Sequence, residues 1–155
     1  MDYLFEKEMK DIENLVFGLS VEASFGIERE RILVFDKAED NIRIVGWTSK
    51  TPLEDINEVY TVDYGVIEKI KELIRTTGIL GVDELELPDM FQLDGNTNTY
   101  YFSDGERTNE IETDEFFKIY CKFNNKPNAK ILKKTLITIQ DLLVTQGKVT
   151  IDICV

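Results

Sequence analysis

The chain has 155 residues, with 30 acidic and 18 basic side chains, a net charge of −12, and no histidine. The absence of imidazole excludes Ser-His-Asp and Cys-His nucleophilic catalysis, and two cysteines alone cannot supply the ligands of a closed structural zinc site. With 43% hydrophobic residues, nine glycines and three prolines, the composition is neither disordered nor fibrous and predicts one globular domain over residues 1–155.

The N-terminal part of the chain predicts a helix followed by a strand pair. Residues 2–15 place apolar side chains near helical spacing, although residues 14–25 also read as an extended segment. Residues 31–36 are a short apolar run, typical of a strand buried on both faces. Residues 42–47 follow a polar loop and predict the hairpin partner of that strand. Residues 48–62 show no periodic pattern and are expected to be irregular.

A helix is expected next, from about Tyr64 to Thr77. Asp63 is a residue type that caps helix N-termini, and Gly78 is the usual residue after a helix C-terminus. The apolar side chains of this segment fall on one side of a helical wheel and the charged ones on the other. Its apolar side consists of Val66, Ile67, Ile70, Leu73 and Ile74. The segment therefore predicts an amphipathic helix that covers a sheet.

A hairpin is the clearest local signal in the second half of the chain. Two strand-like runs within residues 99–112 flank the dipeptide Asp104-Gly105. Asp-Gly tolerates the positive φ angles of a two-residue type I′ turn. With such a turn, Tyr101 lies opposite Thr108.

Two strands and a long helix are expected after the hairpin. Residues 116–123 predict a strand, and residues 128–146 predict a helix that ends before Gly147. One stripe of this helix is apolar and consists of Leu132, Leu136, Ile139 and Leu143. Residues 148–155 alternate between apolar and polar side chains and predict a final strand. The element order predicts an α+β fold, with a mainly antiparallel sheet of about five to seven strands packed against two or three helices.

The motifs of metal and cofactor sites are incomplete. Residues 94–98 resemble the start of a calcium loop, but Thr99 and Gly105 stand where that loop needs Gly and Glu, so a polar loop is the preferred interpretation. Glu110 and Glu112 share a strand face, where two carboxylates are able to bind a divalent ion or divide acid and base roles. A metal-assisted hydrolase is therefore kept as an alternative. Solvated charge is the preferred interpretation of these pairs, so we expect no catalytic residue, metal or cofactor.

Charge is distributed unevenly along the chain. Residues 81–115 hold 11 acids and one base, whereas residues 116–155 hold two acids and seven bases. Acidic side chains mixed with aromatic ones suit a surface that docks on a basic protein, because carboxylates steer the encounter and aromatic rings supply anchors. The candidate partner-binding residues are Tyr100, Tyr101, Asp104, Glu106, Glu110, Glu112, Asp114 and Glu115.

The charge layout leads to a functional hypothesis. We expect a non-catalytic acidic domain that binds a basic protein, as an immunity-type or anti-defence-type inhibitor of bacterial or phage origin does. A self-associating structural or accessory domain is a second alternative. Lys126, Lys130, Lys133 and Lys134 form one ridge of the last helix, but the negative overall charge argues against a nucleic-acid partner, and a solvated helix face is the preferred interpretation.

The expected location is the cytoplasm, without membrane contact. The first eight residues carry acid where a signal peptide carries base. No run approaches the roughly 18 consecutive apolar residues of a membrane span. Cys121 and Cys154 do not make a framework of the secreted kind, so reduced thiols are expected.

Overall fold

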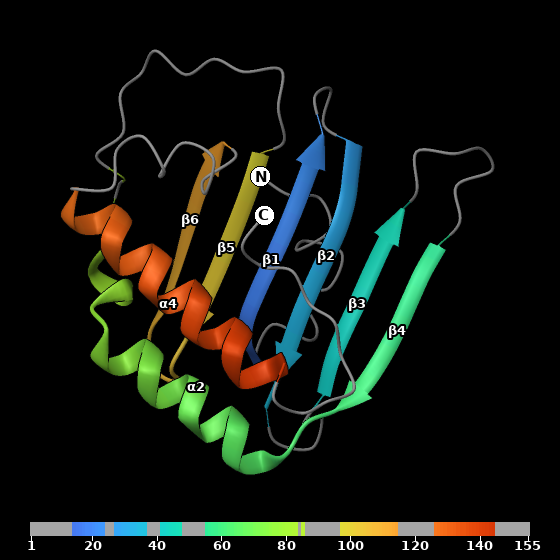
Figure 1. Cartoon of the computed structure of the whole chain (residues 1–155), viewed down its shortest axis with the longest axis horizontal. Helices are drawn as coiled ribbons and strands as arrows, with labels where there is room; N and C mark the ends of the chain where they lie inside the picture. The colour runs from blue at the N-terminus through green and yellow to red at the C-terminus, as the bar shows by residue number, and fades with distance from the viewer. Residues whose placement is uncertain are drawn as a thin grey trace.

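A computed structural model describes residues 14–23, 27–36, 41–47, 55–83, 85, 97–114 and 126–144 (Figure 1). The expected N-terminal helix, apart from its last residues, and the expected strands at residues 116–123 and 148–155 lie outside this described part. The prediction of one domain over residues 1–155 stays a prediction.

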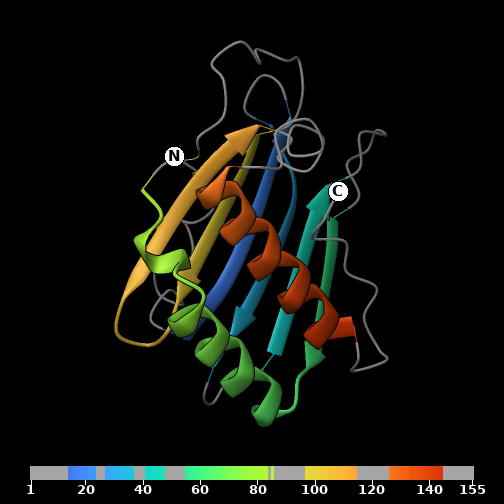
Figure 2. The same ribbon diagram turned by 60° about the vertical axis from the view of Figure 1, so that its left-hand side comes forward.

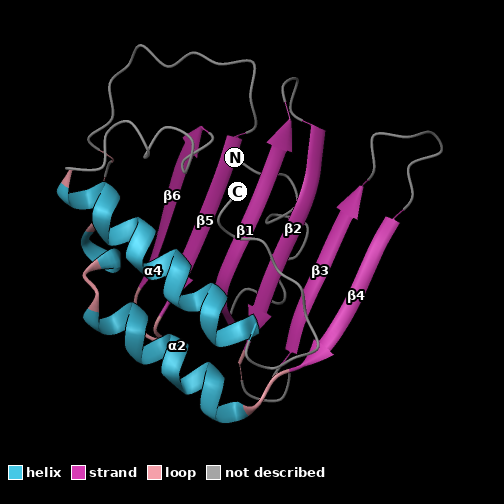
Figure 3. Ribbon diagram, viewed as in Figure 1, coloured by secondary structure: helices cyan, strands magenta, loops and turns pink. Residues whose placement is uncertain are grey.

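The described strands form one sheet in which each strand is antiparallel to its neighbours (Figure 3). Their order across the sheet is β4-β3-β2-β1-β5-β6. Together with the helices, this confirms the α+β class and the antiparallel sheet; the strand and helix totals of the whole chain stay predictions. The strands are β1 (Leu15–Ala23), β2 (Ile27–Phe35), β3 (Asn41–Trp47), β4 (Asp55–Thr61), β5 (Thr97–Ser103) and β6 (Thr108–Asp114).

Two α-helices, α2 (Tyr64–Thr76) and α4 (Pro127–Val144), lie on the same face of the sheet (Figure 2). A short 3-10 helix, η2 (Ile79–Gly81), follows α2. Both helices lie close to their expected positions. Within the part of the chain that the structure describes, neither has the length and apolar character to cross a bilayer.

The main core lies between the helices and the sheet. The expected apolar stripe of α4 is confirmed, since Leu132, Leu136, Ile139 and Leu143 are all buried. The expected apolar side of α2 is also confirmed, with Ile67, Ile70 and Ile74 buried and Val66 and Leu73 packed against the same core. From the sheet, the core takes side chains that include Phe17, Leu19, Ile32, Val34, Tyr100, Phe102 and Ile111.

Strand β2 contributes to both faces of the sheet, as its unbroken apolar run predicts. Ile32 and Val34 belong to the main core, whereas Leu33 and Phe35 form a second cluster with Leu15 on the other face. Successive side chains of a strand point to opposite faces. A strand with both faces buried therefore needs apolar residues at every position.

The prediction of irregular structure for residues 48–62 is wrong for residues 55–61. These residues form β4, which pairs with β3 from Asn41↔Thr61 to Trp47↔Asp55. The apolar residues of β4 are not spaced two apart, so the sequence lacks the alternation that marks a half-buried strand. Pairing with a neighbouring strand overrides this weak local preference.

The two-residue turn predicted for the β5–β6 hairpin is also wrong. Ser103 pairs with Thr108, so the connection has four residues, and Tyr101 lies opposite Glu110 rather than Thr108. The backbone N–H groups of Glu106 and Arg107 donate to Asp104 Oδ1 at 2.9 and 2.8 Å. This side-chain bonding stabilises the longer loop. The register differs from the predicted one by two residues, so every side chain of β6 keeps its expected face.

The ends of α2 are close to those predicted from sequence. Asp63 occupies the N-cap position, but its side chain makes no capping hydrogen bond; its carbonyl oxygen instead accepts from Val66 at 2.9 Å. The helix ends at Thr76, one residue before the expected end. Gly78 follows with a φ of 86°, a conformation that glycine adopts without strain.

Candidate functional site

The candidate partner-binding residues lie on and around the β5–β6 hairpin. Six of them have described side chains, and these fall into an exposed group and a buried group. Asp114 ends β6, but its side chain lies outside the described part, as does the whole of Glu115. Exposed are Glu106, Glu110 and Glu112; Tyr101 is half-buried; Tyr100 and Asp104 are buried.

Glu110 and Glu112 share one face of β6, on the side of the sheet away from the helices. Ile111, between them, belongs to the core under α2 and α4, so its two neighbours point to the opposite face. The cross-strand partners of Glu110 and Glu112 are Tyr101 and Thr99. Glu110 therefore lies beside an aromatic ring and Glu112 beside a hydroxyl side chain.

Tyr100 was expected at the docking surface, and the structure corrects this expectation. The residue is 0% exposed and packs in the main core, and its hydroxyl accepts a hydrogen bond from Asn98 Nδ2 at 3.1 Å. Along β5 it alternates with Tyr101, which packs at the edge of the Leu33–Phe35 cluster. Burial, with a smaller effect of the nearby Glu110 carboxylate, raises the pKa of the Tyr101 hydroxyl. Only Tyr101 remains as a partly accessible aromatic anchor.

Asp104 was also expected at the docking surface, but its side chain is only 3% exposed. Besides the two N–H groups on Oδ1, its Oδ2 lies 3.8 Å from Arg75 Nε and 3.9 Å from Arg107 Nε. Hydrogen bonding from the Arg107 backbone, more than the two guanidinium charges, holds the pKa of Asp104 below its ordinary value. Its role is therefore to hold the hairpin loop in shape rather than to contact a partner.

A pocket of about 270 Å³ lies between the hairpin loop, α2 and the first residues of β1. Its charged lining consists of three carboxylates and two bases, which leaves a formal charge of −1 at neutral pH. The lining residues that carry charge are Asp36, Lys71, Arg75, Asp104 and Glu106. We call this cavity the hairpin pocket.

The two bases of the hairpin pocket come from α2 and are both paired. Lys71 Nζ lies 2.9 Å from Asp36 Oδ2 and 3.4 Å from Glu68 Oε1. The hydrogen bond to Asp36 raises the pKa of Lys71 and outweighs the opposite effect of burial. Arg75 pairs with Glu72 and reaches the hairpin. One helix thus ties the end of β2 and the tip of the hairpin together.

Sequence reasoning named Asp104 and Glu106 but did not find the two bases of this pocket. Lys71 and Arg75 lie outside the apolar arc of α2 and read as solvent-exposed charge. The one available signal is Asp36, an acid directly after a strand that is buried on both faces. Such a carboxylate needs a positive partner when it is buried with the strand, but the sequence does not say which base supplies it.

The hairpin pocket holds one hydroxyl side chain among its charged groups. Ser103, the hydroxyl that lines the pocket, accepts the N–H of Gly105 at 3.1 Å and has carboxylates and paired bases around it. Among the described residues, no three carboxylate, thiol or imidazole side chains gather in a way that holds a metal ion. The site consists of a loop that hydrogen bonds hold in shape, next to exposed carboxylates on one face of β6.

No protein-family model and no curated protein sequence matches the chain.

Proposed function

We propose that this protein is a non-catalytic binding domain that docks on a basic partner protein through the hairpin loop and the outer face of β6. The observation that carries the proposal is the pair of exposed carboxylates Glu110 and Glu112 on that face, next to the exposed Glu106 of the loop. Within the described residues, neither Glu106 nor Glu112 takes part in an ion pair.

The hairpin presents these carboxylates in a fixed geometry. Asp104 holds the loop from inside, and α2 braces it through Arg75. A backbone that is already held in place loses little conformational entropy when a partner's Lys or Arg reaches the carboxylates that it carries. Opposed charges of this kind mainly increase the association rate and the specificity of a complex.

The partner contact is expected to combine this charge with one aromatic contact. Tyr101 is the cross-strand neighbour of Glu110 and is half-buried, so part of its ring is accessible beside the carboxylate. Arg is well suited to such a surface, because its guanidinium both pairs with carboxylates and stacks on aromatic rings. The proposed form of the activity is inhibition of a basic enzyme, with the acidic face covering a cleft that attracts anions.

Capture from a lysate of the source organism tests the proposal. The test variant, Glu110→Lys with Glu112→Lys, reverses charge on the β6 face. The control, Asp63→Lys with Asp141→Lys, reverses two exposed acids elsewhere on the molecule and gives the same net charge of −8. We expect the wild type and the control to capture one basic partner, which mass spectrometry identifies. The β6 variant is expected to capture at least tenfold less of this partner. Equal recovery by both variants, with unchanged circular dichroism, refutes the proposal.

A further inference from the structure

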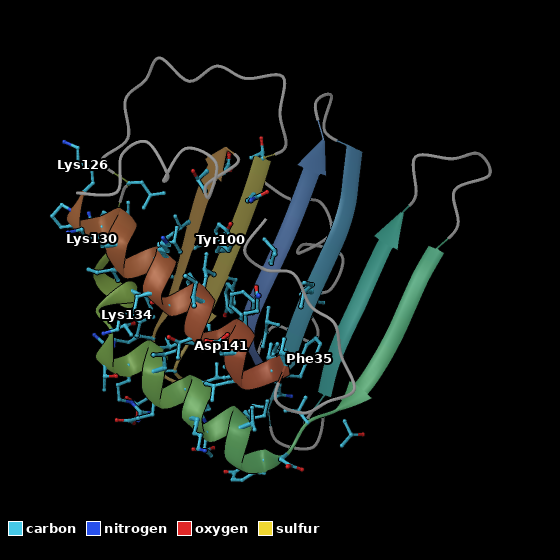
Figure 4. The ribbon with its side chains drawn as sticks, in the orientation of Figure 1. Phe35, Tyr100, Lys126, Lys130, Lys134 and Asp141 are labelled. Atoms are coloured by element: carbon cyan, nitrogen blue, oxygen red, sulfur yellow. The ribbon has the colours of Figure 1, made fainter. Side chains whose placement is uncertain are left out.

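The outer surface of α4 carries a second charged patch, opposite in sign to the β6 face. We call Lys126, Lys130, Lys133 and Lys134 the lysine ridge. Lys130 and Lys134 are exposed, and Lys126 and Lys133 are half-buried. Figure 4 shows Lys126, Lys130 and Lys134 on the left side of α4. A stretch of nine residues therefore presents four positive charges.

The lysine ridge keeps most of its charge in the folded chain. Within the described residues, Lys126, Lys130 and Lys134 form no ion pair. The nearest acid along the ridge is Asp141, seven residues after Lys134 and about 10 Å along the helix axis. That separation exceeds the screening length at physiological salt, so Asp141 neutralises little of the ridge.

The ridge and the acidic β6 face point to opposite sides of the sheet. The apolar stripe of α4 packs on the helix-covered face together with Ile111. The ridge lies on the other side of α4, turned to solvent, whereas Glu110 and Glu112 project from the face that lacks α2 and α4. The exposed glutamates of β6 and the exposed lysines of α4 are thus separated by the sheet and the helix layer within one molecule.

Two exposed apolar side chains continue the same stripe of α4. Ile137 and Val144 lie seven and fourteen residues after Lys130, and 37% and 44% of each is exposed. Residues seven apart lie two helical turns apart on nearly the same side. The exposed Asp141 lies between them on the same side of the helix, so this end of the surface holds two apolar side chains and one acid. The apolar side chains are able to bury some area while the lysines pair charges.

We propose that the lysine ridge of one molecule binds the acidic β6 face of a second copy of this chain. The charges of the two surfaces are complementary. One surface has at least two exposed glutamates, and the other has two exposed lysines that form no ion pair within the described residues. Because the two surfaces differ, the contact is heterologous: one copy keeps a free β6 face, and the other keeps a free lysine ridge. This contact covers the face used in the proposed function, so self-association and partner binding compete.

The net charge of −12 makes the contact depend on the salt concentration. Two copies repel each other at long range, and salt reduces that repulsion over a screening length of about 8 Å at 0.15 M. Ion pairs formed at contact distance are weakened less, up to the point at which still higher salt screens them too. We therefore expect self-association to be strongest near 0.15 M salt and weaker both at 0.02 M and at 1 M.

Sedimentation velocity with the purified chain, at concentrations from 10 µM to 1 mM in 0.15 M NaCl, tests the proposal. We expect the weight-average sedimentation coefficient to rise with concentration for the wild type. Lys130→Glu is expected to increase the dissociation constant at least fivefold, and Lys69→Glu, an exposed lysine of α2 that gives the same net charge of −14, by less than twofold. A monomer at all concentrations, or equal effects of the two variants, overturns the proposal.

A charge-swap mixture identifies the two surfaces. Lys130→Glu with Lys134→Glu makes the ridge acidic, and Glu110→Lys with Glu112→Lys makes the β6 face basic. Each double variant alone is expected to be monomeric, and an equimolar mixture is expected to associate at least as strongly as the wild type. A mixture that stays monomeric while the wild type associates overturns the assignment of these surfaces. None of these readouts involves the basic partner, so a failure of this proposal is distinguishable from a failure of the proposed function.

Discussion

Asp104 shows how a single carboxylate shapes the hairpin. Its Oδ1 accepts two backbone N–H groups, and its Oδ2 faces Arg75 and Arg107. An isolated buried carboxylate is costly, so these four groups explain why an acid is found at 3% side-chain exposure. The same contacts explain why Asp104, chosen from sequence as an exposed residue, is instead buried inside the hairpin loop.

Replacing Asp104 with Asn is expected to destabilise the protein by about 1 to 2 kcal/mol at pH 7, because hydrogen bonds that involve charge are stronger than neutral ones. The lowered pKa of Asp104 means that its charged form stabilises the fold above its ordinary value of 3.8 and that this contribution is lost as the pH falls below it. The difference in unfolding free energy between wild type and variant, measured in urea, is therefore expected to shrink as the pH falls through the lowered pKa of Asp104.

Glu106→Gln is the matched control for Asp104→Asn, since Glu106 is an exposed acid two residues away in the same loop. We expect it to change the unfolding free energy by less than about 0.5 kcal/mol, as is usual at exposed positions. If Asp104→Asn remains equally destabilising at pH 2.5 and pH 7, the stabilisation does not come from the charge of Asp104.

Lys71 is the second residue on which local stability depends. Lys71→Met is expected to destabilise the protein by about 2 kcal/mol, because it leaves the buried Asp36 carboxylate without its ammonium partner. The pKa of Lys71 is raised above its ordinary value of 10.5, so the ion pair contributes its full stability below pH 10.5. This stability is lost as the pH rises through the higher pKa of the folded state. The difference in unfolding free energy between wild type and variant, measured in urea, should therefore be the same at pH 7 and at pH 9.

Lys69→Met provides the comparison for Lys71→Met, because Lys69 is exposed on the same helix. A change below about 0.5 kcal/mol is expected there. Adding Asp36→Asn to Lys71→Met is expected to recover part of the lost stability by removing the unpaired charge. Equal losses from the two lysine variants are inconsistent with a stabilising ion pair between Lys71 and Asp36.

At the level of elements, two glycines illustrate opposite requirements. Gly105, in the hairpin loop, has a φ of 97°, which side chains rarely adopt. Gly65, in the first turn of α2, has ordinary helical backbone and nothing within 4 Å of the position of an added Cβ. Gly105→Ala is therefore expected to destabilise by about 1 kcal/mol, and Gly65→Ala to stabilise by up to about 1 kcal/mol.

Thermal unfolding followed by circular dichroism measures both changes. A lower melting temperature for Gly105→Ala and a higher one for Gly65→Ala is the expected pair of results. If Gly105→Ala melts at the wild-type temperature, the loop adopts a different backbone conformation from the one described, and the four-residue connection between β5 and β6 is wrong.

The elements that could be predicted from sequence are those whose pattern is local. The amphipathic arc of α2, the apolar stripe of α4 and the unbroken apolar run of β2 each depend on a repeat within a few residues. Strand β4 has no such repeat and depends on pairing with β3, from which residues 48–54 separate it. A pairing that rests on backbone hydrogen bonds leaves little trace in the side-chain pattern of either strand.

The candidate site could be predicted only in part, for a related reason. Alternation along the hairpin correctly places Glu110 and Glu112 on one exposed face. The burial of Tyr100 depends on Leu19 across the sheet and on the helices above it, and the pairing of Lys71 with Asp36 joins residues 35 positions apart. Aromatic and acidic residues close together in sequence were therefore divided between core, scaffold and surface.

At the level of the whole molecule, the uneven charge of the sequence remains visible in the folded chain. Glu110 and Glu112 lie on one face of the sheet, and the lysine ridge lies beyond the other face, with the sheet and helix layer between them. Among the described ion pairs, Lys71 of α2 pairs with Asp36, and Arg75 of α2 and Arg107 lie near Asp104. The folded chain thus carries separate negative and positive surfaces.

This separation predicts how salt affects stability. A net charge of −12 destabilises the compact state through self-repulsion, and salt screens that repulsion. We expect the melting temperature, measured at 10 µM to keep the chain monomeric, to rise by a few degrees between 0.01 and 0.3 M NaCl.

Making the ridge acidic with Lys130→Glu and Lys134→Glu changes the net charge to −16 and should steepen the rise. Reversing Glu110 and Glu112 to Lys changes it to −8 and should flatten the rise. If the three proteins respond to salt equally, net repulsion contributes little, and local ion pairs such as Lys71–Asp36 dominate the electrostatics of the fold.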